Sequence, residues 1–475
     1  MRNLRAKALI AAGAAVLAGC AVGPDYVRPE APTPTLYKEG IGWKVAQPQD
    51  AARRRDWWQV FDDPQLDALI TQVDVSNQNV RFAEAQWRQA IGVVQQARAG
   101  LFPTLSINNT DTRSRSPSLA NAPVNSTAAV NVYSLSLNAS WAPDFWGGVR
   151  RTVEGDVANA QASAAEVANA RLLAQAQLAL NYFQLRTVDA QRQLLEDTVA
   201  AYTKTLELTR NRYAAGVVAK VDVVQAETQL KSTQAQAIDL GVQRAQLEHA
   251  IAILIGKPPA ELAIAPLQLG TTIPSVAVDI PSELLQRRPD IASAERKMAA
   301  ANAQIGVATA AYFPSVTLSG ASGYRASILS GLIAAPNRFW SLGAAIGETL
   351  FDAGARGAVV DQATAAHDAS VASYRQTVLT AFQQVEDNLA ALRILEEEAA
   401  AQDDAVKAAR QSTELTLNQY KAGIVSYLNV VIIQAAQLSN EASAVRIQGQ
   451  RLAASIALIQ ALGGGWDAAE LSAQN

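Results

Sequence analysis

The chain has 475 residues, of which 49% are hydrophobic, so it is long enough to bury a sizeable core. Its net charge is −3 and its pI about 5.7, which excludes the basic surface that nucleic-acid binding requires. Cys20 is the only cysteine, which excludes intramolecular disulfides and cysteine-based zinc sites. Segments rich in Ala, Gln and Leu favour long helices over β-sandwiches.

The first nineteen residues have the pattern of a secretory signal peptide. Three basic residues precede the apolar run Ala8–Ala18, which is too short to span a bilayer as a helix. The letters LAGC at Leu17–Cys20 resemble the bacterial lipobox, in which the cysteine receives a diacylglyceryl group and becomes the mature N-terminus. We therefore expect cleavage after residue 19, acyl chains such as palmitate on Cys20, and a lipid-anchored segment over residues 20–60.

Two segments half a chain apart have nearly the same sequence. Asn211–Val224 reads NRYAAGVVAKVDVV and Asn418–Val431 reads NQYKAGIVSYLNVV, with seven of fourteen positions identical and an offset of 207. Each half of the chain predicts the same order: helix, strand, strand, long helix, tight turn and return helix. We expect structural repeats over 61–270 and 271–466, interleaved in one architecture, and a C-terminal tail over 467–475.

Four segments are predicted to be strands. Tyr133–Trp141 and Phe339–Phe351 alternate apolar with polar residues, and Phe102–Thr110 and Pro314–Tyr324 do so less regularly. This alternation is typical of membrane β-strands, with apolar side chains toward lipid, although a half-exposed sheet in a soluble protein shows it too. Aromatic residues near the strand ends predict an interfacial girdle, with core packing as the alternative. They are Trp141, Trp146, Phe339 and Trp340.

Two proline-free stretches predict unusually long helices. Thr152–Tyr213 and Gly357–Tyr420 each contain about sixty residues, which is on the order of 90 Å of helix. Their apolar positions are largely Ala, which allows close, coiled-coil-like packing. Gly216 and Gly423 follow at the usual helix stop position, and a shorter helix then returns. The chain therefore predicts two similar helical hairpins, side by side, with their tips pointing the same way.

Four strands are too few to close a membrane barrel, and an open sheet edge is not tolerated in lipid. Two chains would supply eight strands and an interior filled by side chains. Three chains would supply twelve strands and a lumen wide enough to conduct. The strands therefore predict a symmetric oligomer of two or more chains.

Several segments resemble signatures of the outer membrane factor family. They are CAVGPDYVRP (Cys20–Pro29), RDWWQVFDDPQLDALI (Arg55–Ile70), LLQRRPDIASAERKMAAANAQIGVATAAYFP (Leu284–Pro314) and ALGGGW (Ala461–Trp466). The resemblance is to the TolC-like family, and within it to the lipoprotein branch of OprM/NodT type that serves tripartite efflux. It covers essentially the whole chain, and the RRPD segment is highly specific.

The resemblance implies a mainly α protein with membrane β: a homotrimer whose twelve-stranded outer-membrane β-barrel, four strands per chain, continues into a long periplasmic α-helical barrel. It implies a passive, gated export duct for drugs or other small molecules, with a part in antibiotic resistance. The implied partners are a periplasmic adaptor (membrane fusion) protein, an inner-membrane pump of the resistance-nodulation-division type, and outer-membrane lipid. No cofactor is implied beyond the lipid on Cys20.

The family also suggests which residues carry the function. The tips that contact the adaptor match Tyr213, Gly216, Tyr420 and Gly423. The helix starts that line the closed periplasmic gate match Asp222, Tyr427, Leu428 and Asn429. A ring of Asp222 carboxylates would favour cations, but an acid in a first helical turn is equally explained by the helix dipole.

Two local details modify this expectation. Asn429 stands where the family often has Asp, so we expect a gate closed more by apolar contact than by charge. Ser426 and Asn429 resemble an N-cap arrangement. Arg212 could pair with Asp222 or a neighbouring helix, or remain solvated.

Other functions remain as alternatives. The outer component of a type I protein secretion system shares the family fold, and a periplasmic coiled-coil lipoprotein without a pore would share the helices. An enzyme is disfavoured. His249 and His367 each stand alone within a helical segment, and the sequence shows no nucleophile–base, phosphate-loop or metal-site spacing.

Overall fold

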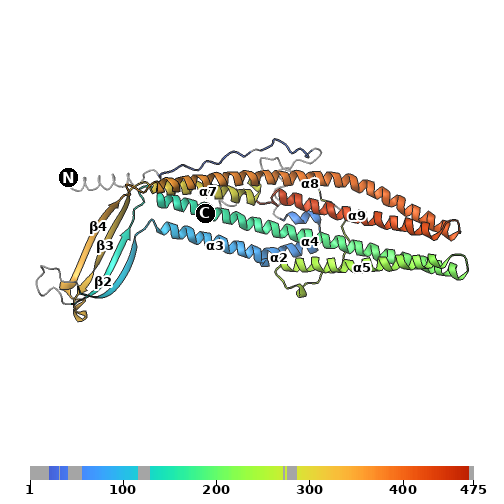
Figure 1. Ribbon diagram of the computed structural model, residues 1–475, viewed down its shortest axis with the longest axis horizontal. Coiled ribbons are helices and arrows are strands. Elements are labelled where there is room, and N and C mark those ends of the chain that lie inside the picture. Colours follow the sequence, from blue (N-terminus) through green and yellow to red (C-terminus); the bar gives the residue numbers. More distant parts are fainter. Residues whose placement is uncertain are drawn as a thin grey trace. The chain divides into compact units, whose positions relative to one another are not determined.

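The computed structural model describes residues 21–31, 33–40, 56–115, 129–270, 273–274 and 286–469. These residues form long helices and one four-stranded sheet (Figure 1). They divide into two compact units. The first contains Trp87–Ala162, Ala294–Tyr374 and the N-terminal segment that ends at Glu30. The second contains Ala31–Gln86, Ser163–Ser293 and the chain from Arg375 onward.

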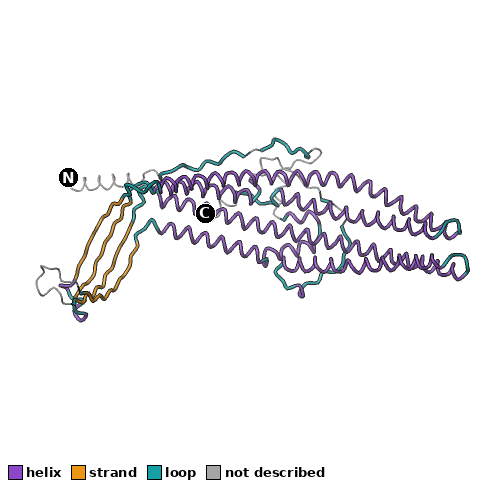
Figure 2. The backbone as a smooth tube through the Cα atoms, viewed as in Figure 1, coloured by secondary structure: helices purple, strands orange, loops and turns teal. Residues whose placement is uncertain are grey.

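The sheet, drawn in orange in Figure 2, lies in the first unit. It is antiparallel throughout, in the order β1-β2-β3-β4. Its strands are β1 (Thr104–Ser114), β2 (Val130–Trp141), β3 (Ser315–Ala326) and β4 (Arg338–Gly347). The predicted fourth strand was too long at its end. Ala353 and Gly354 have positive φ angles and turn the chain toward the next helix, so residues 348–351 lie outside the strand.

The strand register separates the residue types onto two faces, because directly opposed residues share a face. Ile107 lies opposite Leu137, Leu137 opposite Ser322, and Ser322 opposite Trp340. Counted in steps of two, one face is apolar and its large side chains are exposed: Leu105, Ile107, Leu137, Leu318, Leu342 and Ile346. The other face carries small polar residues such as Asn108, Ser136, Ser319 and Ser341. The predicted alternation therefore occurs in all four strands, except toward the end remote from the helices, where the apolar face also carries Asn109, Asp111, Arg113 and Arg338.

Helices precede and follow the strands in the same order in both halves. α3 (Gln78–Ala99) precedes β1, and α4 (Gly148–Ala214) follows β2. α7 (Pro289–Ala310) precedes β3, and α8 (Ala355–Lys421) follows β4. Short 3-10 helices complete the described elements: η2 (Trp57–Phe61), η4 (Pro259–Glu261), η5 (Leu329–Gly331) and η6 (Ala335–Asn337).

The two repeats build hairpins of equal size. α4 and α8 have 67 residues each. The return helices α5 (Lys220–Leu254) and α9 (Tyr427–Ala461) have 35 each. Within the second unit the two tips point the same way (Figure 1), as the duplicated turn predicted.

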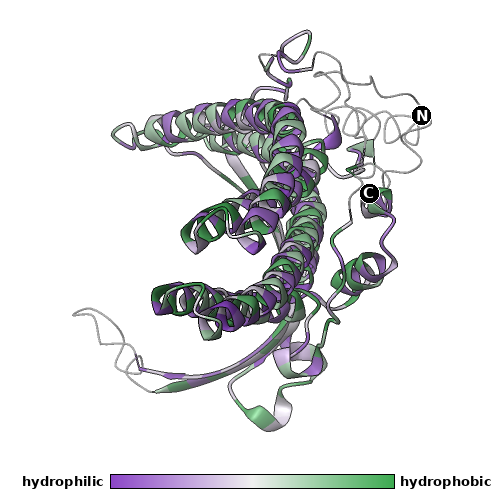
Figure 3. Ribbon diagram, turned by 90° about the vertical axis from the view of Figure 1, so that its right-hand side faces the viewer, coloured by the Kyte–Doolittle hydropathy of each residue, from purple (hydrophilic) through white to green (hydrophobic). Residues whose placement is uncertain are grey.

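Hydrophilic and hydrophobic residues are mixed along every long helix (Figure 3). Among the described helices, none combines the length and the apolar character needed to cross a membrane.

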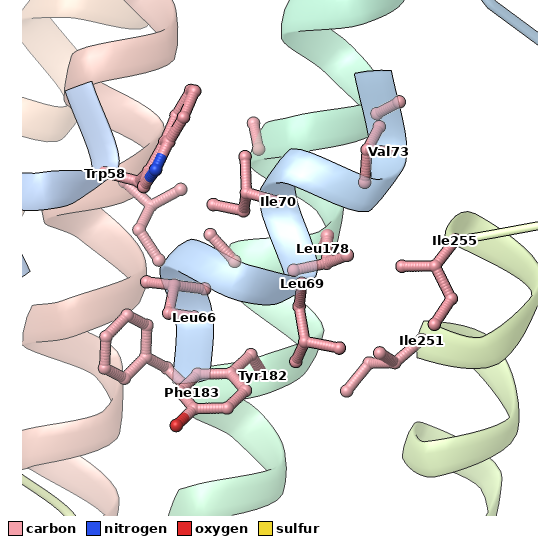
Figure 4. Packing of buried hydrophobic residues seen from close by; sticks show 14 of the residues in the cluster. Trp58, Leu66, Leu69, Ile70, Val73, Leu178, Tyr182, Phe183, Ile251 and Ile255 are labelled. Atoms are coloured by element: carbon pink, nitrogen blue, oxygen red, sulfur yellow. The ribbon is translucent and has the colours of Figure 1, made fainter. Parts of the chain in front are cut away.

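The main core of the second unit surrounds α2 (Pro64–Ser76) (Figure 4). α2 begins at the N-cap Asp63, whose carboxylate accepts hydrogen bonds from the N–H groups of Gln65 and Leu66. Its buried residues Leu66, Leu69, Ile70 and Val73 follow the spacing of one helix face and pack against α4 and α5. Each such side chain contributes about 1.5–3 kcal/mol when fully buried. Trp57 and Trp58 are also buried in this core.

Candidate functional site

The two hairpin tips have the same backbone geometry. At the end of α4, Val217 N–H donates to the Arg212 carbonyl and Gly216 N–H to the Tyr213 carbonyl, both at 2.9 Å. At the end of α8, Ile424 and Gly423 repeat these bonds to Gln419 and Tyr420, at 2.9 and 3.0 Å. Both glycines are left-handed, with φ of 75° and 78°. This is the Schellman ending that an αL glycine makes possible, and it explains why both copies of the turn motif have glycine at this position.

The two tips differ in their side-chain surroundings. Tyr213 is 45% exposed, whereas its counterpart Tyr420 is 1% exposed. Lys220, which begins α5, is exposed, whereas its counterpart Tyr427, which begins α9, is 2% exposed. The sequence presented these positions as equivalent, but of the four residues only Tyr420 and Tyr427, at the α8/α9 tip, are buried.

The buried aromatic residues belong to a cluster that we call the tip core. It contains Tyr202, Leu206, Ala226, Leu230, Tyr420, Tyr427 and Val430, contributed by all four hairpin helices. The rings of Tyr420 and Tyr427 are 5.7 Å apart, and the Tyr420 hydroxyl donates to Thr209 Oγ1 at 3.3 Å. Burial raises the pKa of the Tyr427 phenol above its usual range. The tip core joins the two hairpins of one chain to each other.

Arg212, which lies on α4, contacts and stabilises the α8/α9 tip. Its guanidinium lies 4.5 Å from the centroid of the Tyr420 ring and donates a hydrogen bond to the Tyr420 carbonyl oxygen. That carbonyl also accepts the Gly423 N–H, and it lies at a helix C-terminus, where a cation is favoured. Of the three possibilities for Arg212, the structure shows the contact with a neighbouring helix; the pairing with Asp222 does not form.

The predicted gate residues lie at the starts of the return helices. Asp222 is half-buried in the first turn of α5, while Leu428 and Asn429 are exposed on α9. Tyr427 is buried between the hairpins, so in this conformation it packs the tip core and cannot itself line an opening. Ser426 is the N-cap residue of α9, but its side chain makes no capping hydrogen bond, which corrects the expected N-cap interaction.

Beside the tip core, α4, α8 and α9 enclose a groove of about 570 Å³. Gln434 lines it at 5% exposure; its amide nitrogen donates to Thr205 Oγ1, while its Oε1 atom has no hydrogen-bond partner. Glu441, also in the lining, receives hydrogen bonds from Arg410 and Gln437 at 2.6 and 3.1 Å. The groove therefore offers one free acceptor and a partly neutralised carboxylate.

The predicted girdle residues lie at both ends of the sheet. Trp141 and Trp146 stand at the helical end, where their indole N–H groups donate to the backbone carbonyls of Leu101 and Pro314. Trp340 is at the other end, on the apolar face and 72% exposed. Phe339 precedes it and must point to the opposite, polar face, so its place in a girdle on the apolar face is corrected.

The middle of the first hairpin contains a buried charged network that the sequence did not predict. Arg186 pairs with Asp189 at 3.0 Å, with side chains 2% and 3% exposed. Arg244 of α5 reaches the same Asp189 at 2.8 Å and pairs with Glu248 at 3.1 Å. Arg186 also donates to the carbonyl of Ala265, so the network fixes the segment after α5 against the hairpin. The i,i+3 and i,i+4 charge spacings were visible, but nothing local showed that the two pairs meet.

Cys20 lies outside the described residues. The chain directly after it is held against the start of α4: Val22 N–H donates to the Trp146 carbonyl at 3.1 Å. Arg151 in turn donates to the carbonyls of Val22 and Gly23, at 3.1 and 3.2 Å. These bonds fix the N-terminal segment at the helical end of the sheet within the first unit.

The sequence model described as "Outer membrane efflux protein" matches residues 69–257 and 280–464 of this chain. The chain belongs to the outer membrane efflux protein family. Membership confirms the predicted function class, an outer-membrane efflux channel that is not an enzyme, and excludes a coiled-coil lipoprotein without a pore.

Individual relatives agree along the full length. The toluene efflux pump outer membrane protein TtgC of Pseudomonas putida is 32% identical over 461 residues, covering 96% of this chain and 95% of TtgC. The pyoverdine export outer membrane protein OpmQ of Pseudomonas aeruginosa is 32% identical, covering 91% and 94%.

Solved structures confirm the fold class. The outer-membrane channel OprN superimposes with a TM-score of 0.88 at 29% identity, covering 94% of this chain and all of that one. The open state of the Neisseria gonorrhoeae MtrE outer membrane channel superimposes with a TM-score of 0.82 at 28% identity, covering 94% and 99%. A mainly helical chain with a four-stranded sheet is thus the fold of outer-membrane efflux channels.

Proposed function

We propose that three copies of this chain form the outer-membrane duct of a tripartite efflux system. The three sheets close into one twelve-stranded barrel, and the helical hairpins continue it as a periplasmic tunnel. The observation that carries this proposal is the strand register, which puts exposed apolar side chains on one face of all four strands and small polar side chains on the other. That division suits a wall between lipid and a wet lumen.

The need for other copies follows from the two sheet edges. β1 and β4 each pair on one side only within the described chain, so each carries a row of free backbone groups. Such groups cost several kcal/mol each in lipid, and pairing β1 of one chain with β4 of the next removes the cost at every edge. Three chains give twelve strands, enough for a conducting lumen.

The N-terminus is held to the membrane by lipid on Cys20. This is supported by the LAGC motif and by the bonds that fix Val22 and Gly23 next to the start of α4. A lipid on Cys20 would then insert beside the barrel, at the end where the tryptophans Trp141 and Trp146 lie.

The hairpin tips dock to a periplasmic adaptor that is bound to an inner-membrane pump of the resistance-nodulation-division type. The exposed Tyr213 and Gly216 and the groove beside the tip core offer surface for this contact. Asp222, Leu428 and Asn429 form the gate, which opens when the α8/α9 tip leaves the tip core. The cargo consists of small organic molecules, since relatives are named for toluene efflux and pyoverdine export.

Native mass spectrometry of the detergent-solubilised protein tests the assembly. The sample is a Cys20→Ser variant behind an ordinary cleavable signal peptide, which removes the lipid but keeps the strands. A particle of three chains that still requires detergent is expected. A water-soluble monomer would contradict the barrel, because lipid would then be the only membrane contact.

The docking role has its own test. A Gly423→Pro variant cannot form the αL turn or donate the bond to Tyr420, so the tip is distorted while the sheet is untouched. We expect trimers of normal mass in cells that have lost efflux. Undiminished drug resistance with this variant would count against docking through the tips.

A further inference from the structure

The polar face of the sheet carries one charge. Counting along the register, the positions on this face are Ser, Thr, Asn, Gly, Ala, Val or Phe339. Among the described strands, Arg325 is the only charged residue on that face. Arg338, at the same end of the sheet, is opposite Tyr324 and therefore belongs to the apolar face. The inner wall of the proposed barrel is thus neutral except at a single position.

Arg325 lies at the end of the sheet that is remote from the helices. β3 begins at Ser315, shortly after α7 ends, and Arg325 is its second-last residue. In the proposed orientation, with the helices in the periplasm, this end faces outward.

The surroundings of Arg325 hold its side chain without neutralising it. The guanidinium carbon lies 5.0 Å from the centroid of the Phe339 ring, a diagonal neighbour on the same face. The residue is exposed, and no carboxylate among the described residues forms an ion pair with it. An aromatic ring attracts the cation but adds no net charge, so the positive charge remains available to solutes.

We propose that Arg325 and its symmetry copies form a cationic ring at the outward end of the channel, which enriches anionic solutes there and repels cationic ones. This inference rests on the proposed trimeric barrel. Rings of basic side chains favour anions in wide pores, and here the neutral wall leaves the ring unopposed. Its reach is set by salt, about 10 Å at 0.1 M ionic strength and about 30 Å at 0.01 M.

The electrostatic potential of the ring must be measured close to it, because the conductance of the whole channel also depends on the gate at the far end of the tunnel. A cysteine introduced on the polar face reports the local potential through the rates at which it reacts with an anionic and a cationic methanethiosulfonate of equal size. The ratio of the two rates cancels the reactivity of the thiol itself. In the Cys20→Ser background the introduced thiol is the only one in the chain.

Ser341→Cys is the reporter site. Ser341 is exposed on the polar face and lies opposite Ala321, so it is about 13 Å along the strands from Arg325. Ser315→Cys is the distant reporter on the same face, about 33 Å along β3. The reagents are added from the outer side of intact cells or oriented vesicles, and they do not cross lipid.

At about 0.01 M ionic strength, Arg325→Gln should lower the anionic-to-cationic rate ratio at Ser341→Cys about fivefold, and the loss should shrink below twofold at about 1 M salt. Arg325→Lys should retain the ratio, because it keeps the charge. The matched control Arg338→Gln, at the same end but on the apolar face, should leave the ratio unchanged. The effect of Arg325→Gln at Ser315→Cys should be clearly smaller.

Two results would overturn the inference, and they are distinguishable. If the thiol reacts readily but Arg325→Gln leaves the ratio unchanged at low salt, the ring does not exist, while the barrel stands. If neither reagent reaches Ser341→Cys in the trimer, the polar face is not the wall of a wet lumen. The proposed barrel then fails together with the ring.

Discussion

The two helical hairpins of this chain have equal helix lengths and the same turn geometry, but they differ in which side chains they bury. At the tips, the second hairpin buries its tyrosine: Tyr420 is 1% exposed and Tyr213 is 45% exposed. At the middle, the first hairpin buries its arginine: the Arg186 side chain is 2% exposed and that of its counterpart Arg393 is 45% exposed. Duplication therefore reproduced the backbone, whereas the neighbours of each copy decide which residues hold it in place.

The difference indicates that the two hairpins have different roles. The first hairpin is fixed at its middle by a buried network. The counterpart of its Arg244–Asp189 pair in the second repeat, Arg451–Glu396, is longer, at 3.9 Å, and its Glu396 side chain is 76% exposed. The second hairpin is held at its tip by aromatic packing and by Arg212 from α4. Aromatic contacts at a tip can be released locally, while a buried ion pair cannot be broken without a large cost. The α8/α9 hairpin is thus the one suited to move.

The largest effect is expected from Arg186→Ala. It leaves the Ala265 carbonyl without its donor and Asp189 with Arg244 as its remaining charge partner, at a cost of about 3 kcal/mol or more in unfolding free energy. Arg393→Ala removes pairs with Glu39 and Glu397 that are made by an arginine side chain 45% exposed, and it should cost much less stability. The denaturation midpoints of the two detergent-solubilised variants check this. Equal losses would mean that the repeats are not differently anchored at the middle.

Next in size is Tyr420→Ala, which empties a fully buried aromatic site in the tip core and should cost about 3 kcal/mol. Because the change is local, amide hydrogen exchange in the α8/α9 tip should accelerate about a hundredfold. Its matched control is Tyr213→Ala, at the equivalent exposed position, which should shift exchange by less than about threefold, as surface substitutions do. Similar acceleration in both variants would remove the asymmetry of the tips.

Arg212→Gln should have a smaller effect of about 1–2 kcal/mol on opening of the α8/α9 tip. It deletes one cation–π contact and one hydrogen bond to the Tyr420 carbonyl. Gln419, the equivalent residue of the other hairpin, is exposed, so Gln419→Ala serves as control and should be neutral. Limited proteolysis at the tip distinguishes them. Cleavage of Arg212→Gln at the wild-type rate would show that the contact does not fasten the tip.

Tyr427→Phe should be nearly neutral at pH 7 and should matter only in alkali. Burial raises the pKa of Tyr427 above its ordinary value of 10.0, so the folded tip favours the neutral phenol. Its contribution is complete below pH 10 and is lost as the pH rises toward the folded pKa. Tip exchange in the wild type should therefore accelerate above pH 10, and Tyr427→Phe should weaken that dependence. If the pH dependence of tip exchange is the same in Tyr427→Phe as in the wild type, groups other than Tyr427 cause it.

Much of the fold could be predicted from the sequence because it depends on periodic patterns. The period-two alternation of β2 and β4 located the strands, and the Gly216 and Gly423 motifs located both turns to the residue. The error at the end of β4 arose because Leu350 and Phe351 continue the apolar pattern after the backbone has left the sheet. The error in placing Phe339 in the girdle was avoidable. Consecutive residues of a strand point to opposite faces, and the neighbouring Trp340 already occupied the apolar face.

The rest depends on contacts that leave no local signal. Tyr213 and Tyr420 stand in the same motif, and only the position of α4 beside α8 and α9 makes one exposed and the other buried. Arg186 and Arg244 lie on different helices, and each has an ordinary acidic neighbour in sequence. Their meeting at Asp189 follows from the packing of α4 on α5, which the sequence leaves unspecified.

The central claim is that the buried Tyr420 keeps the channel closed while Tyr213 does not. Single-channel conductance in planar bilayers tests it directly, with wild type, Tyr420→Ala and Tyr213→Ala compared at the same salt concentration. The structure predicts a conductance several-fold above wild type for Tyr420→Ala and a wild-type conductance for Tyr213→Ala. Equal conductance in all three proteins would show that the tip core does not hold the gate.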